Sequence, residues 1–99
     1  MTNSDQPIAE FKAMNVTSKK ITVVIYGDRV EVRSKHAWPS PKYDITSIPL
    51  KSVTAISSNS DGLAFQRVTV ASSGGSTDIK LKRADAERFT EIVRSMITT

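Results

Sequence analysis

Apolar and polar residues alternate along most of this 99-residue chain, and the alternation stops at turn-forming residues. Successive side chains of a β-strand point to opposite faces, so this pattern predicts strands with one buried face. The clearest stretch is ITVVIYGDRVEVRSK, Ile21 to Lys35, in which Gly27-Asp28 joins two alternating runs. A two-residue Gly-Asp loop favours a tight hairpin, because glycine accepts a positive φ without steric cost.

The loop length of this hairpin sets which residues face each other. Tyr26 should lie opposite Arg29, Ile25 opposite Val30, and Val23 opposite Val32. One face is then the core and consists of Ile21, Val23, Ile25, Val30 and Val32. The other face carries Thr22, Val24, Tyr26, Arg29, Glu31 and Arg33. That second face is half polar, as expected for an antiparallel sheet with one solvated side.

The same pattern predicts further strands on both sides of the hairpin. They are Ile8–Met14, about Asp44–Ile48, Ser52–Ser58, Phe65–Ala71 and the TDIKLKR stretch from Thr77. Ile8–Met14 is also compatible with a short helical turn, and we favour a strand. A bend is expected near Pro49, and turns are expected at Asn59–Gly62 and at Ser72–Ser76. We interpret Ser34–Tyr43 as a loop, because Pro39 and Pro41 remove two backbone donors. Residues 1–7 are polar and form a flexible N-terminus.

The period changes near the end of the chain, which predicts a helix over 84–97. Apolar residues recur there at spacings of three and four, at Ala86, Phe89, Ile92, Val93, Met96 and Ile97. They form one apolar stripe along the helix. Asp85 and Glu87 lie in the first turn, where the helix dipole favours negative charge. The sequence therefore predicts about seven short strands followed by one amphipathic helix that covers the open end of a bent sheet.

Length and composition indicate a single globular domain over 8–99. The hydrophobic content of 38% and charged content of 24% are ordinary for such a domain. The chain contains no cysteine, and its start has neither the basic nor the apolar region of a signal peptide. We therefore expect a cytoplasmic protein. The net charge of +4 permits attraction to an acidic protein, anionic lipid or nucleic acid, but also simply keeps a small domain soluble.

The candidate chemistry argues against an enzyme and against a cofactor. The single histidine, His36, lies on the proline-containing loop, and no motif places a carboxylate beside it. With one histidine and no cysteine, a metal site would need clustered carboxylates, which the sequence lacks. The SSGGS stretch has no following Lys-Ser/Thr of a phosphate loop, so it is a hairpin turn.

The order of elements resembles the pleckstrin-homology-like (PH-like) fold, and in particular the small bacterial PH-like domains. The resemblance rests on ITVVIYGDRVEVRS, on IPLKSVTAI from Ile48 to Ile56, and on IKLKRADAERFTEIVRSMI. It covers roughly residues 11–98. It implies a strongly bent seven-stranded antiparallel barrel capped by one helix, whose Phe89 plugs the barrel. The loop that contains Trp38 is longer than the family pattern.

The resemblance also implies a non-enzymatic binding module. Bacterial relatives are associated with protein contacts, so we expect a protein partner and an adaptor role, such as that of a small bacterial or phage-encoded effector. Eukaryotic relatives bind phosphoinositides through the loop that corresponds to 15–20, and Lys19 and Lys20 make anionic lipid the first alternative. The arginine of that eukaryotic signature is missing. Relatives also bind peptides by strand addition at an open edge, which suits homo-oligomers as well.

The candidate binding residues are a basic cluster with two aromatics: Lys19, Lys20, Arg29, Arg33, Lys35, Trp38, Lys42 and Tyr43. The competing interpretation is a solvated outer face, with Glu31 between the two arginines, and a Trp38 that packs back onto the sheet. Nucleic-acid binding is the second alternative and is disfavoured. It usually needs several exposed aromatics, whereas Phe11, Phe65 and Phe89 are expected in the core, which leaves Tyr26, Trp38 and Tyr43.

Overall fold

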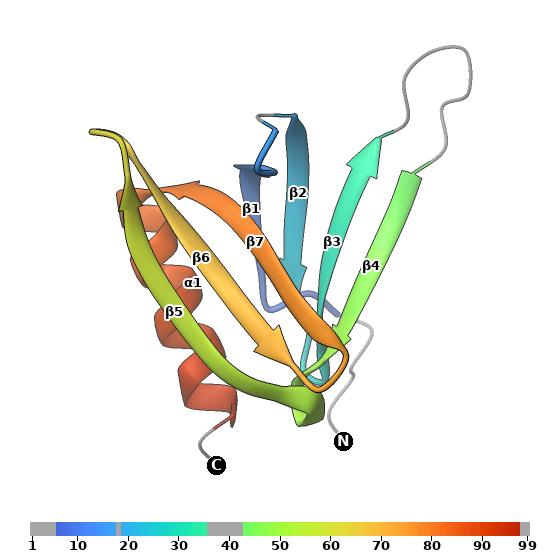
Figure 1. The fold of residues 1–99 in the computed structure, drawn as a ribbon. Helices are drawn as coiled ribbons and strands as arrows, with labels where there is room; N and C mark the ends of the chain where they lie inside the picture. The colour runs from blue at the N-terminus through green and yellow to red at the C-terminus, as the bar shows by residue number, and fades with distance from the viewer. Residues whose placement is uncertain (1–5, 18, 36–42, 98–99) are drawn as a thin grey trace.

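The structure is a computed structural model that describes residues 6–17, 19–35 and 43–97. Within these ranges the chain forms seven strands, one 3-10 turn and one helix (Figure 1). The elements are β1 Ala9–Met14, β2 Lys20–Ile25, β3 Arg29–Lys35, β4 Tyr43–Pro49, η1 Leu50–Ser52, β5 Val53–Asp61, β6 Phe65–Ser72, β7 Gly75–Lys82 and α1 Arg83–Ile97. The predicted mainly β fold with a C-terminal helix is confirmed.

All seven strands belong to one antiparallel sheet, in the order β4-β3-β2-β1-β7-β6-β5. Strands that follow each other in the chain pair in the sheet, except β4 and β5, which lie at opposite edges. The β1–β7 contact joins the two halves. The β1–β7 register consists of one position, Met14 opposite Lys80, whereas β1 and β2 pair along the whole of both strands. The sheet is bent, as expected, but it is not closed into a barrel, because β4 and β5 remain its two edges.

The opening hairpin has the predicted register. Val23 lies opposite Val32, and the Tyr26 N–H donates to the Arg29 carbonyl at 2.8 Å. The expectation that Gly27 supplies a positive φ is wrong, since its φ lies outside the left-handed region. The left-handed glycines are instead Gly62, in the turn before β6, and Gly75, the first residue of β7, with φ of 81° and 135°. This hairpin therefore closes without the conformation that glycine alone adopts easily.

Several strands are longer than the sequence predicts. Ser34, Lys35 and Tyr43 of the predicted loop belong instead to β3 and β4. The rest of that prediction, 36–42 with Pro39 and Pro41, lies outside the described residues. Strand β5 continues to Asp61, because the polar stretch 59–61 pairs with the start of β6. Of the predicted N-terminal segment, 1–5 lies outside the described residues.

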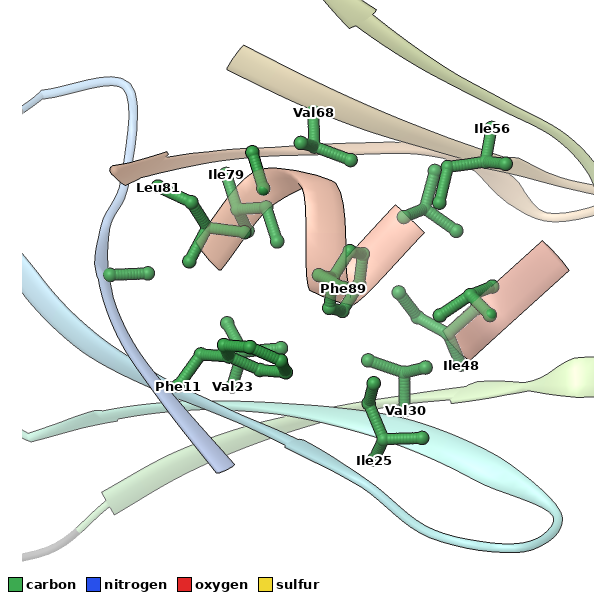
Figure 2. Packing of buried hydrophobic residues seen from close by; sticks show 14 of the residues in the cluster. Phe11, Val23, Ile25, Val30, Ile48, Ile56, Val68, Ile79, Leu81 and Phe89 are labelled. Atoms are coloured by element: carbon green, nitrogen blue, oxygen red, sulfur yellow. The ribbon is translucent and has the colours of Figure 1, made fainter. Parts of the chain in front are cut away.

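Helix α1 begins directly after β7 and lies against β5, β6 and β7 (Figure 1). Its side chain Phe89 is completely buried and meets the ring of Phe11 edge-on, with 5.8 Å between ring centroids and 83° between ring planes. Figure 2 shows Phe89 between Val23 and Val30 of the first half of the sheet and the apolar side chains of β6 and β7. The apolar stripe of the helix is thus turned into the core, and Phe89 reaches across to the first half of the sheet.

We expect Phe89→Ala to lower the free energy of unfolding by about 3–5 kcal/mol, because it leaves a cavity where both halves of the sheet meet the helix. Urea denaturation followed by circular dichroism measures this loss. Leu63→Ala is the control, since Leu63 is fully exposed and its removal should change stability by less than about 0.5 kcal/mol. Equal stabilities of the two variants would contradict this account of the core.

Candidate cationic groove

A groove of about 490 Å³ lies where β1 and β7 end and β2 and β6 begin, close to the single β1–β7 pairing. Its lining combines two kinds of side chain. The apolar ones are Ala13, Met14, Ile21 and Phe65, and the cationic ones are Lys12, Lys20, Arg33 and Lys82. Thr22 supplies a hydroxyl group. We call this the cationic groove.

Strand alternation explains why these charges gather on one face. Phe11 and Ala13 of β1 point into the core, so Lys12 points outward. The register places Lys12 opposite Thr22, and Thr22 opposite Arg33, in one row across three strands. Lys82 comes from the other half of the sheet, where its partner across the strands is Phe65. The groove therefore depends on the contact between β1 and β7, which brings the two halves together.

Three of the four cations have no acidic partner within the part of the chain that the structure describes. No described carboxylate lies within ion-pairing distance of the ammonium groups of Lys12, Lys20 or Lys82. Like charges that converge on an apolar lining create a positive potential and raise the local concentration of anions. The groove is therefore suited chemically to a ligand that carries both negative charge and apolar surface.

Arg33, the fourth cation, is held in place by a network on the same face. Its guanidinium donates to Glu31 Oε1 at 2.8 Å and to the Tyr26 hydroxyl at 2.6 Å. The other oxygen of Glu31 accepts from Arg29 Nε at 2.8 Å, and the Arg29 guanidinium lies 4.0 Å from the centre of the Tyr26 ring. These contacts fix the Arg33 side chain at the border of the groove before any ligand arrives.

The two arginines also determine the charge state of Glu31. Hydrogen bonds from Arg29 and then from Arg33 hold the pKa of the Glu31 carboxyl below its ordinary value. The same hydrogen bonds raise the pKa of each arginine. Glu31 therefore stays ionised in the folded protein, and it neutralises part of the charge of Arg29 and Arg33.

The outer face of the hairpin is less solvated than the sequence indicated. Tyr26 and Val24 are 6% and 1% exposed, so the interpretation of Tyr26 as a candidate exposed aromatic is wrong. Arg29 covers the ring of Tyr26, and Val24 lies on a central strand between Glu10 and Glu31. The aliphatic parts of long charged side chains can bury apolar neighbours in this way.

The structure places the eight sequence candidates in different surroundings. Lys20 and Arg33 line the groove, Lys19 is exposed in the preceding turn, and Arg29 belongs to the Glu31 network. Lys35 and Tyr43 face each other at the ends of β3 and β4 and are described by their backbones alone. The two remaining candidates, Trp38 and Lys42, lie outside the described residues, as does His36.

Lys12 and Lys82 line the groove although the sequence pattern does not single them out, and Phe65 lies elsewhere than expected. Phe65 was expected in the core, but it is only partly buried and lines the groove. The alternation along β6 indicates this position. Val68 and Val70 point into the core, so residue 65, at an odd spacing from both in the odd–even alternation of the strand, lies on the opposite face. Phe11 and Phe89 are in the core, as expected.

The described part of the chain contains no group of three or more His, Cys, Asp or Glu side chains arranged to hold a metal ion. None of its helices has the length and apolar character needed to cross a membrane. Comparison with protein-family models and with curated proteins finds no match to this sequence. The groove must therefore be interpreted from its own chemistry.

We expect Glu31→Gln to lower the free energy of unfolding at neutral pH by about 1–3 kcal/mol, because two charge-assisted hydrogen-bonded contacts are weakened. The folded-state pKa of Glu31 lies below its ordinary value of 4.5, so the ionised carboxyl stabilises the fold above that pH. This contribution is lost as the pH falls through the folded-state pKa. The difference between variant and wild type should therefore shrink in acid, as measured by urea denaturation at a series of pH values.

The control for this experiment is Glu91→Gln on the exposed surface of α1. It removes one carboxyl group of the same type, and it should leave the pH dependence of stability close to that of the wild type. A pH profile of Glu31→Gln that matches this control would show that the network contributes nothing to stability.

Proposed function

We propose that this protein is a non-enzymatic binding module that docks an acidic, partly apolar segment of a partner protein in the cationic groove. The observation that carries the proposal is the combination of three unneutralised lysines and a positioned Arg33 around an apolar lining. Carboxylates of the segment would pair with the cations, and one of its apolar side chains would contact Met14 and Phe65.

The apolar lining favours a peptide over a lipid headgroup. Phosphorylated sugar headgroups carry hydroxyl groups that need polar partners, and of the groove's uncharged side chains only Thr22 offers one. A peptide segment can place an aliphatic or aromatic side chain against the lining, which removes apolar surface from water. Anionic membrane attachment, the alternative that the lysines also suggest, would use the same charges without using the lining.

A binding role agrees with the chemistry of the groove. Among the described residues that line it, the polar side chains are three ammonium groups, one guanidinium and one hydroxyl, with no carboxylate and no imidazole that could act as a base towards Thr22. Such groups attract and orient an anion. We therefore propose recognition rather than turnover, and an adaptor role in the cytoplasm that agrees with a sequence without cysteine.

The fold supports membership in the PH-like family as part of the same proposal. The seven antiparallel strands, the bend between β1 and β7, and the terminal helix with Phe89 in the core agree with that architecture. The cationic groove differs from the pattern of the eukaryotic lipid-binding relatives, because it includes Lys82 from the end of β7. Assignment of the function therefore rests on the groove and not on the fold.

The test uses a short fluorescent peptide that alternates glutamate with leucine, and a matched peptide with glutamine in place of glutamate. We expect the wild-type protein to bind the acidic peptide in an anisotropy titration and to lose affinity as salt rises, because screening weakens exposed charges. Lys82→Glu and Lys12→Glu should each weaken binding by roughly tenfold. The glutamine peptide should bind weakly to all variants.

Lys51→Glu is the matched control, because Lys51 is an exposed lysine on η1 outside the groove. It makes the same change in net charge and should retain wild-type affinity. If Lys51→Glu and Lys82→Glu lose affinity for the acidic peptide equally, net charge alone explains the loss, and the groove is not the binding site. In the other outcome, the protein binds vesicles that contain phosphatidylserine, or a single-stranded oligonucleotide, and does not bind the acidic peptide. That outcome would contradict the proposed protein partner and would identify the ligand as lipid or nucleic acid.

A further inference from the structure

The two edges of the sheet are protected to different degrees. At the β5 edge, Arg94 of helix α1 donates a hydrogen bond to the backbone carbonyl of Ile56 at 3.3 Å, and the register shifts between Val53 and Ala55. Covering side chains and bulges are devices that prevent an edge from pairing with another strand. At the β4 edge, no described strand or helix lies beyond the strand, which forms the outer margin of the sheet in Figure 1.

The register identifies which backbone groups of β4 point to this open edge. The Leu50 N–H donates to the Asp28 carbonyl at 2.9 Å, in the same register that pairs β3 with β4. Bonded and non-bonded pairs alternate in an antiparallel ladder, so Ile48, Thr46 and Asp44 bond to β3. The backbone groups of Ser47, Ile45 and Tyr43 therefore point away from β3, towards the edge. Pro49 belongs to the same set of edge-facing positions as Ser47 and Ile45, so its lack of an N–H removes no hydrogen bond between β3 and β4.

We propose that β4 pairs antiparallel with β4 of a second copy of this chain, with Ile45 opposite Ile45 of the partner subunit. This inference goes beyond the proposed function and does not depend on it. In this register Tyr43 faces Ser47 of the partner subunit, and the reverse pair follows by two-fold symmetry. All three outward-pointing positions of one strand then meet outward-pointing positions of the other. The pairing is isologous, so it closes after two chains.

Side chains of β4 support a second copy as the occupant. Ile45 is 55% exposed on the outer face, and the proposed register places it beside the partner's Ile45, which removes apolar surface from water. Asp44 would face Thr46 of the partner subunit, so no like charges oppose each other. The strand contains no lysine, the residue that most often protects an edge. Its pattern is therefore complementary to itself.

Three facing pairs form a small interface, so we expect a monomer–dimer equilibrium that depends on concentration and not an obligate dimer. Sedimentation velocity over a concentration series measures it. The wild type should move towards about twice the 10.8 kDa of one chain as concentration rises. Ile45→Lys should remain monomeric, because two ammonium groups would face each other across the pair. Leu63→Lys, the matched change at another exposed leucine-sized side chain, should dimerise as the wild type does.

A second variant and a second measurement separate this pairing from other ways to dimerise. Ser47→Pro removes an edge-facing N–H but no bond to β3, so it should lower the dimer fraction while the thermal unfolding remains cooperative. In hydrogen exchange, the amides of Ile45 and Ser47 should gain protection as the wild type is concentrated, and should stay unprotected in Ile45→Lys. A wild type that stays monomeric up to roughly 1 mM, or a dimer that Ile45→Lys leaves intact, would overturn the proposal.

Discussion

Contact between Phe89 and both halves of the sheet is the constraint on which this fold depends. The halves β1–β4 and β5–β7 are joined in the β1–β7 register at one position, Met14 opposite Lys80, which is too little backbone pairing to hold them at a fixed angle. The angle is instead fixed by the apolar side chains that pack around Phe89, with Phe11 from one half and Val68 from the other (Figure 2). Because the cationic groove combines Lys12 of β1 with Lys82 of β7, its geometry follows from the same packing.

The outer face of the hairpin shows how structural and functional charges are separated. Glu31 accepts hydrogen bonds from Arg29 and Arg33. Buried Tyr26 contacts both guanidinium groups, that of Arg29 with its ring and that of Arg33 with its hydroxyl. Because Arg33 is already hydrogen-bonded to Glu31 and Tyr26, its side chain would lose little conformational entropy when a ligand binds. The lysines of the groove are different, because their long stems carry unneutralised charge that can adapt to a partner. Arg33, held by hydrogen bonds to Glu31 and Tyr26, gives the groove one pre-positioned contact beside lysines whose ammonium groups have no ion pair among the described residues.

The alternation and spacing of apolar residues predict the strands, the hairpin and the helix correctly. The features that they do not predict depend on contacts between residues far apart in the sequence. Alternation and helical period were sufficient for the hairpin register and for the stripe that contains Phe89, because both depend on residues close in sequence. The groove could not be predicted, since Lys12 and Lys82 come together only through the β1–β7 contact. Phe65 is strongly hydrophobic, which predicts a place in the core. Its position in β6 puts it on the face opposite to Val68 and Val70, and this position decides the outcome. The pattern also could not show that Arg29 covers Tyr26, because that burial comes from a charged side chain.

The two proposals have a joint consequence that neither has alone. A two-fold axis that relates two antiparallel β4 strands at Ile45 runs perpendicular to the combined sheet, so the outer faces of both chains stay on the same side. Each outer face bears one cationic groove, and the row from Lys12 through Arg33 leads directly to Ile45 at the edge. A dimer would therefore present two grooves to one partner surface. Since a second binding event within a complex proceeds at an effective concentration of about millimolar, weak individual grooves would suffice for a stable interaction with a partner that repeats its acidic segment.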